Sequence, residues 1–255
     1  MADPALTRWW AVVPAERLEE AYAVLLDVFP DGFAEIAVAD GVELSAYLPA
    51  GEEPAAIPAW PPLRSEPVAD GWRDAWRAFH RPVEVGGVWV RPPWLDEPAD
   101  ALLLEPGYAF GTGAHPTTRG VAAFLREEPP GRLLDLGCGS GLLSILAASW
   151  GHTPVEAWDL DPHAVEATRA NLARNGLDGR VTVRHADVLV DPLPAADLAL
   201  ANIERRVNET LLARDGLPTR VIASGLRCED AFAHPGWHVE REEVEDGWRT
   251  LVLVR

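Results

Sequence analysis

The sequence predicts an α/β protein in which a small α+β domain precedes a doubly wound parallel sheet that ends in an antiparallel hairpin. The main observation is a change of apolar pattern near residue 100, beyond which strand-like and helix-like segments alternate regularly. The expected domains are residues 1–68, a linker helix and connector at 69–99, and a large domain at 100–255.

The N-terminal domain begins with a β-α-β-β order of elements, expected at residues 9–13, 15–29, 33–38 and 42–48. Asp40-Gly41 lies between the last two strands and is a strong hairpin turn signal. This order is typical of a ferredoxin-like module, with residues 63–68 as its closing edge strand. Residues 49–62 are rich in proline and alanine, so the second helix of that module is expected to be short or absent.

Between the domains, Asp70 is a candidate helix N-cap, and one face of the following helix carries three aromatic residues, Trp72, Trp76 and Phe79. Such a stripe favours docking of one domain on another over ligand binding. Residues 83–90 indicate a strand, and residues 91–98 form a proline-rich connector.

The large domain is expected to carry strands at residues 133–136, 155–159, 181–185, 198–202 and 221–224. Helices are expected from Ser140 and over residues 162–175. In such a sheet, ligands bind at the carboxyl ends of the strands. The runs at 237–241 and 250–254 flank Asp246-Gly247 and predict a terminal hairpin, which purely parallel dinucleotide-binding sheets lack.

The composition excludes several function classes. The chain carries 40 Asp and Glu residues against 22 cationic residues, all of them Arg, for a formal net charge of −18. The absence of lysine excludes Schiff-base chemistry and a P-loop lysine. The acidic balance argues against sequence-specific or general nucleic-acid binding, because Lys and Arg supply phosphate affinity. A basic protein partner fits the charge better.

Two cysteines, Cys138 and Cys228, are too few for a disulfide framework and lack metal-knuckle spacing. No apolar run approaches the ~18 residues of a membrane span, and the N-terminus has no cationic leader pattern. We therefore expect a cytoplasmic monomer that binds neither a metal ion nor a membrane.

The most informative segment is a strand that turns through three glycines, Gly137, Gly139 and Gly141, into a helix. Glycine permits close backbone approach, and Gly137 and Gly139 are the expected ligand contacts. A dinucleotide fingerprint needs a third glycine where Leu142 stands, which disfavours a nicotinamide-dependent oxidoreductase. With Asp135 two residues before the turn, the pattern suits a nucleoside ligand that has an amino-acid tail.

Acidic residues follow the next two strands. Asp159 ends the second strand, 22 residues after Gly137, and can accept both ribose hydroxyls. Asp161 is better placed to cap the helix that begins at Pro162. After the third strand, Asp187 can meet an adenine amino group, although a plain turn acid explains it equally well.

The DLGCGSG turn and the later acid resemble a class I S-adenosylmethionine-dependent methyltransferase. Residues 105–118, EPGYAFGTGAHPTT, resemble the signature of the bacterial PrmA family, which methylates ribosomal protein eleven of the large subunit. Residues 72–77 are similar to the interdomain helix of that family, and the β-α-β-β start matches its small substrate-recognition domain. The resemblance implies a Rossmann-like catalytic domain and S-adenosylmethionine as cofactor.

The same resemblance places cofactor contacts at Thr118, Gly137, Asp159 and Asn202, with Phe110 over the cofactor. The glycines of residues 111–113 can form a lid with Phe110 that excludes water, or an ordinary connector. For His115, a structural hydrogen bond is favoured over a general-base role, since no acidic partner is near in sequence.

Methyl transfer from a sulfonium needs a neutral, aligned nucleophile. Lysine has a reference pKa of about 10.4, so the acceptor amine must first lose a proton. Asn202, at a strand end, can offer its side-chain carbonyl to that amine and is the expected catalytic residue. The alternative is an ordinary strand-end turn former.

The chain departs from the family after Asn202-Ile203, where Glu204-Arg205-Arg206 replaces apolar residues. Glu204 can orient or deprotonate an amine, but a solvated helix N-terminus explains it more simply. Residues 227–236 leave little room for the usual long helix. The expected function is methylation of lysine and α-amino nitrogens on ribosomal protein eleven. The alternatives are a related enzyme with another protein substrate and a non-catalytic ribosome-binding module.

Overall fold

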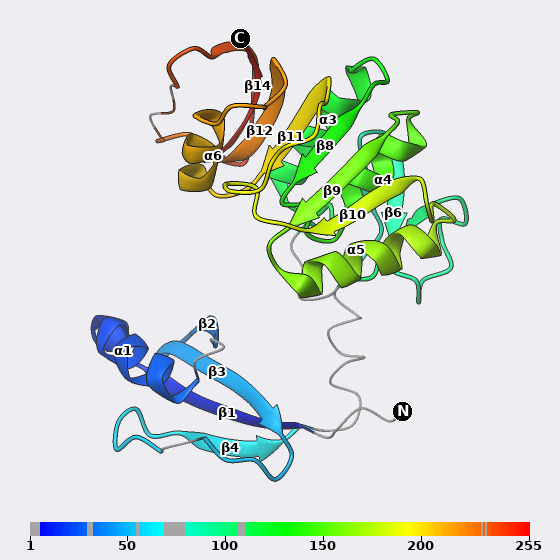
Figure 1. Ribbon diagram of the computed structural model, residues 1–255. Helices are drawn as coiled ribbons and strands as arrows, with labels where there is room; N and C mark the ends of the chain where they lie inside the picture. Colours follow the sequence, from blue (N-terminus) through cyan, green and yellow to red (C-terminus); the bar gives the residue numbers. More distant parts are fainter. Residues whose placement is uncertain are drawn as a thin grey trace. The chain divides into compact units, whose positions relative to one another are not determined.

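The computed structural model describes residues 6–29, 33–54, 57–68, 80–106, 111–230, 232 and 234–255. The chain divides into two compact units, Met1–His80 and Arg81–Arg255 (Figure 1). The predicted aromatic linker helix over residues 70–79 and the predicted cofactor contact Phe110 lie outside the described residues.

The first unit is a four-stranded antiparallel sheet with the strand order β2-β3-β1-β4. Its elements are β1 (Leu6–Val13), a short 3-10 turn (Ala15–Arg17), α1 (Leu18–Val28), β2 (Ala34–Val38), β3 (Gly41–Pro49) and β4 (Arg64–Pro67). Trp9, Val13, Leu25 and Leu44 are buried between α1 and the sheet. Within residues 50–54 and 57–63 no second helix is present, so the ferredoxin-like assignment stays a prediction.

The second unit opens with a small three-stranded sheet of β5 (Val83–Val85), β6 (Val88–Arg91) and β7 (Leu102–Leu103). The prediction of one strand over residues 83–90 is therefore wrong. Gly86 and Gly87 have positive φ values of 58° and 77°, which turn the chain into a hairpin. A Cβ on Gly86 would lie 2.7 Å from the Trp150 ring, so the turn also packs closely on the large domain.

The main sheet has seven strands in the order β10-β9-β8-β11-β12-β14-β13. They are β8 (Leu133–Leu136), β9 (Val155–Asp159), β10 (Val181–His185), β11 (Leu198–Asn202), β12 (Arg220–Arg227), β13 (His238–Glu245) and β14 (Trp248–Val254). The first five strands in this order are parallel. β14 runs antiparallel to β12, and the edge strand β13 runs antiparallel to β14. The predicted doubly wound sheet with a terminal hairpin is confirmed, including the turn at Asp246-Gly247.

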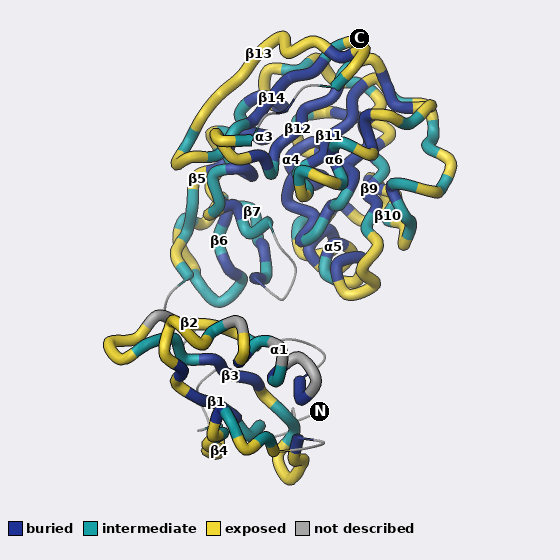
Figure 2. Tube along the Cα trace, turned by 90° about the vertical axis from the view of Figure 1, so that its left-hand side faces the viewer, coloured by how far each residue is buried: buried dark blue, intermediate teal, exposed yellow. Residues whose placement is uncertain are grey.

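Helices cover both faces of this sheet. One core contains side chains of α3 (Pro116–Glu127), α4 (Leu142–Ser149) and α5 (Pro162–Arg174), and the other contains side chains of α6 (Arg205–Leu212). Successive side chains of a strand point to opposite faces of the sheet, so each strand contributes to both cores. On β11, Leu198 and Leu200 belong to the first core, and Ala199 and Ala201 belong to the second. In Figure 2 the inner strands are buried, whereas β13 forms an exposed edge.

Among the described residues, no helix is both long and apolar enough to span a bilayer.

Candidate active site

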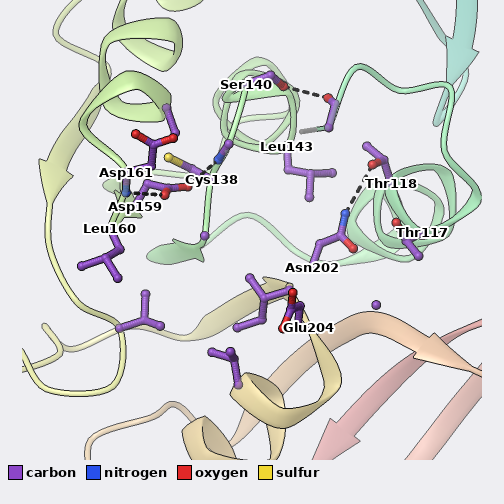
Figure 3. A pocket seen from close by; sticks show the side chains of 18 of the residues that line it. Thr117, Thr118, Cys138, Ser140, Leu143, Asp159, Leu160, Asp161, Asn202 and Glu204 are labelled. Atoms are coloured by element: carbon purple, nitrogen blue, oxygen red, sulfur yellow. Dashed lines mark hydrogen bonds between the residues drawn. The ribbon is translucent and has the colours of Figure 1, made fainter. Parts of the chain in front are cut away.

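A cavity of about 730 Å³ lies at the carboxyl ends of the parallel strands (Figure 3). The strand order reverses between β8 and β11, and open α/β sheets bind ligands at such a reversal. The volume is typical of small-molecule sites. Following the sheet, the lining comes from Asp187–Leu189 after β10, Asp159–Asp161 after β9, Gly137–Ser140 after β8, Asn202–Glu204 after β11, Gly225 on β12 and Trp248 on β14.

The structure brings most of the predicted site residues together in this cavity. Thr118, Gly137, Gly139, Asp159, Asp187 and Asn202 all line it. Residues Gly111 and His115, from the segment that resembles the family signature, also line it. The placement of Phe110 is outside the described residues, so its predicted position over the cofactor stays a prediction.

The glycine turn has a backbone conformation and a close packing that require glycine at residue 137, and backbone hydrogen bonds hold it in place. Gly137 has a φ of 81°, and a Cβ there would lie 2.3 Å from Ile203 Cγ2. The backbone N–H groups of Gly137 and Cys138 both donate to the carbonyl oxygen of Trp158, at 2.8 and 3.0 Å. The turn is thereby held against the ends of both neighbouring strands, β9 and β11.

Asp159 ties the glycine turn to the second strand end. One carboxylate oxygen accepts the Gly139 N–H at 2.8 Å, and the other accepts the Asp161 N–H at 3.0 Å (Figure 3). A carboxylate can accept about four hydrogen bonds, so capacity remains for ligand hydroxyls. Asp161 caps α5 by accepting the His163 N–H at 2.8 Å, as its position predicts.

Asp187 belongs to a turn that is stabilised by its own side chains. Its Oδ1 accepts the Leu189 N–H at 2.8 Å, and its N–H donates to Asp191 Oδ2 at 2.8 Å. Arg214 donates to the Asp191 carbonyl at 2.8 Å and also to the Val188 carbonyl. Asp187 therefore stabilises its own turn through the bond from Leu189, as the alternative prediction requires. It also lines the cavity, where it can meet a ligand.

Asn202 ends β11 and is oriented by α3. Its Nδ2 donates to Thr118 Oγ1 at 3.3 Å (Figure 3), and Thr118 is only 1% exposed. This hydrogen bond uses the amide N–H and leaves the side-chain carbonyl oxygen for another donor. The backbone behind Asn202 is also fixed, since the Ile203 carbonyl accepts from Asn208 Nδ2 at 2.9 Å.

His115 caps a helix. Its Nδ1 lies 3.3 Å from the Thr117 N–H nitrogen and 2.8 Å from Thr117 Oγ1, at the start of α3. Its ring meets Trp248 edge-on, with centroids 4.8 Å apart. Burial, with the nearby cations Arg119 and Arg227, lowers the pKa of His115. These contacts support a structural role for His115 over a general-base role.

Two ionisable residues near the glycine turn, Asp135 and Cys138, are buried and have raised pKa values. Asp135 is buried and accepts the Ser144 hydroxyl at 2.6 Å, and its burial raises its pKa to about 6. Cys138 lines the cavity, with Sγ 3.4 Å from Thr168 Oγ1, and burial raises the pKa of its thiol.

Sequence reasoning missed the side chains that join the signature segment to the glycine turn. Asn171 on α5 donates to the Ser140 carbonyl at 2.9 Å and accepts the Glu105 N–H at 3.0 Å. Ser140 Oγ donates to the Gly111 carbonyl at 2.7 Å. The partners are 29 to 66 residues apart, and no local pattern marks them. Trp248 and Gly225 were missed for the same reason.

Comparisons with known proteins agree with this architecture. A relative named ribosomal protein L11 methyltransferase from Moorella thermoacetica is 34% identical over 283 aligned positions, covering 97% of this chain and 85% of the relative. Relatives of that name from Exiguobacterium and Heliobacterium modesticaldum are 34% and 36% identical. Each of these two alignments spans 64% of the relative, which is less than two thirds of its length.

A solved structure is also similar. The crystal structure of a ribosomal protein L11 methylase from Lactobacillus delbrueckii subsp. bulgaricus superposes with a TM-score of 0.59 at 28% identity, covering 66% of this chain and 94% of that one. The family model described as ribosomal protein L11 methyltransferase (PrmA) matches residues 65–255. The chain therefore belongs to the PrmA family.

Proposed function

We propose that this protein transfers methyl groups from S-adenosylmethionine to lysine and α-amino nitrogens of ribosomal protein L11. One observation carries the proposal. Asn202 and Thr118 meet the glycine turn and Asp159 in a single cavity at the reversal point of the sheet. The names of the family and of its relatives supply the substrate.

The cavity fits the cofactor. S-adenosylmethionine supplies an activated methyl group on a sulfonium. Asp159 would accept hydrogen bonds from the ribose hydroxyls, and Asp187 would accept one from the adenine amino group. Gly137 and Gly139 would let the backbone approach the amino-acid tail, since neither carries a Cβ. Thr118 and Asn202, which line the same cavity, would contact that tail as well.

The chain contributes to the transfer mainly by positioning. The Asn202 side-chain carbonyl would accept an N–H from the acceptor amine, because Thr118 already engages the amide N–H. This contact would orient the neutral amine so that its lone pair is aimed at the methyl group. Positioning of two reactants can supply a large share of a rate enhancement.

The charge and domain order support a basic protein substrate. A formal net charge of −18 attracts basic proteins over long range. In this proposal residues 1–68 form a ferredoxin-like recognition domain, residues 69–99 connect the domains, and residues 100–255 carry the chemistry. The protein acts as a monomer in the cytoplasm and needs no metal ion.

Intact-mass spectrometry of ribosomal protein L11 tests the proposal, with S-adenosylmethionine and with a no-enzyme control. Each transferred methyl group adds about 14 Da. If the mass is unchanged while calorimetry detects S-adenosylmethionine binding, the substrate is a different protein. If neither is detected, the non-catalytic ribosome-binding alternative replaces the proposal.

A further inference from the structure

The cavity continues past Asn202, beyond the part that suits a nucleoside. The lining from β10, β9 and β8 provides the acids and glycines of a nucleoside site. On the other side of β11 the lining changes to Glu204, Gly225 and Trp248, because β12 and β14 follow β11 in the sheet. Asn202 lies between these two ends. We call Glu204 and Trp248, with the cavity wall between them, the acceptor end.

Glu204 presents a carboxylate to this end of the cavity. It is the N-cap residue of α6, but its side chain makes no capping hydrogen bond, unlike Asp161 at the start of α5. Within the part of the chain that the structure describes, its carboxylate has no hydrogen bond or ion pair. The adjacent Arg205 is paired elsewhere, with Glu209 at 2.9 Å and Asp230 at 3.4 Å. Glu204 is exposed, so its carboxylate is solvated and lies where a second substrate can reach it.

Trp248 supplies an aromatic wall that binds cations. The guanidinium of Arg227 lies 4.0 Å from the centre of its ring. Trp248 also lines the cavity. An indole ring attracts an ammonium group by its electron-rich face, and the interaction is stronger where water is excluded.

We infer that Glu204 and Trp248 bind the ammonium group of the acceptor side chain as it enters, and so select cationic side chains for methylation. The inference rests on the proposed function and adds a specificity device to it. An unpaired carboxylate that lines the same cavity as an aromatic residue is complementary to a lysine ammonium. Glu204 acts as a positioning residue during binding, and Asn202 remains the group that meets the reacting nitrogen.

Kinetic analysis of Glu204→Gln with ribosomal protein L11 tests this role. The KM for the protein substrate should rise roughly tenfold, while kcat stays within about twofold and the pH profile of kcat keeps its midpoint. A matched control is Glu209→Gln, on the same helix but outside the cavity. It should leave both constants unchanged. Trp248→Phe, which keeps an aromatic ring, should raise KM less than Trp248→Leu.

Binding provides a readout that does not depend on turnover. In calorimetry with S-adenosylhomocysteine present, the Kd for L11 should be about tenfold weaker for Glu204→Gln than for the wild type. With lysine-acetylated L11 as the probe, the two proteins should bind equally, because the ammonium charge is gone. The affinity for S-adenosylhomocysteine itself should be the same in both.

The outcomes separate this inference from the proposed function. Wild-type methylation of L11 with an unchanged KM and Kd in Glu204→Gln overturns the inference alone. A fall in kcat with a shifted pH profile, at constant KM, makes Glu204 a proton acceptor and also overturns it. If the wild type neither binds nor methylates L11, both the inference and the proposed substrate are wrong.

Discussion

The side chain of Asn202, at the end of β11, donates to Thr118 Oγ1 near the start of α3, across 84 residues of sequence. The amide of Asn202 is thereby oriented by a buried hydroxyl on another element. This single contact joins the strand end that would meet the acceptor to the helix that begins within the segment resembling the family signature. It also decides which end of the amide is available to an amine.

Thr118→Val should impair the transfer step while leaving the fold intact. Valine keeps the shape of threonine but removes the acceptor for Asn202 Nδ2, so the amide loses its preferred orientation. We expect the single-turnover rate to fall by about tenfold or more, since small misplacements of reacting groups are costly. The free energy of unfolding should change by about 1 kcal/mol, the usual net value of one hydrogen bond. An unchanged rate would show that Thr118 does not orient Asn202.

Asp159→Ala should weaken S-adenosylmethionine binding. The substitution removes the expected ribose acceptor and also the acceptor of the Gly139 and Asp161 N–H groups. We expect a loss of about 1.5–3 kcal/mol in calorimetry, the range for hydrogen bonds to charged groups. Glu166→Ala on α5 removes an exposed carboxylate outside the cavity and serves as the control. Equal affinities for the two variants would contradict the role given to Asp159.

Gly225→Ala should lower the stability and the activity of the protein more than an alanine substitution at an unhindered glycine does. A Cβ at Gly225 would lie 2.0 Å from the Ile203 carbonyl oxygen, so the segment that carries Asn202 would have to move. Gly236 has a similar φ, 83° against 87°, but a Cβ there would meet no atom within 4 Å. Gly236→Ala therefore measures the backbone strain alone, about 1–2 kcal/mol. Urea denaturation and turnover of both variants should show a larger stability loss and a large activity loss only for Gly225→Ala.

Asp135→Asn should change how stability depends on pH. Burial raises the folded-state pKa of Asp135 from 3.8 to about 6, so the folded chain holds this proton more tightly than the unfolded chain. The resulting stabilisation is present at low pH and is lost as pH rises from about 4 to 6. The loss is on the order of 3 kcal/mol at 1.36 kcal/mol per pKa unit. Urea denaturation from pH 4 to 8 should show that the free energy of unfolding of the variant rises relative to that of the wild type between about pH 4 and 6.

The control for that experiment is Asp197→Asn. Arg132 lowers the pKa of Asp197 to about 2, so this carboxylate is charged in both the folded and the unfolded chain above about pH 5. The stability difference between this variant and the wild type should therefore be constant from pH 5 to 8. A flat difference for Asp135→Asn as well would mean that Asp135 titrates normally in the folded protein.

Local chemistry made much of this fold predictable. The Asp246-Gly247 turn and the alternation of segments after residue 100 predicted the terminal hairpin and the doubly wound sheet. The glycine turn and the strand-end position of Asp159 predicted where a ligand would bind. The prediction of one strand over residues 83–90 was wrong because Gly86-Gly87 is a turn signal inside an apolar run.

The rest depends on contacts between distant parts of the chain. Asn171 looks like any polar residue on a helix, and its role follows from the two backbone groups that it meets, Ser140 and Glu105. Trp248 reaches the cavity because β14 lies next to β12, which the sequence of elements alone does not specify. Gly225 is required by the approach of Ile203, which no periodicity reveals.

The position of β14 has a consequence for the order in which the sheet can form during synthesis. Although β13 precedes β14 in the chain, β14 is its only partner strand among the described residues, and β14 in turn pairs with β12. A growing chain that has not reached residue 254 offers β13 no complete partner. The strand ends that carry Gly137, Asp159 and Asn202 can therefore assemble first. The strand that holds Trp248 is completed last, so the cavity lining at Gly137, Asp159 and Asn202 is built before the lining at Trp248.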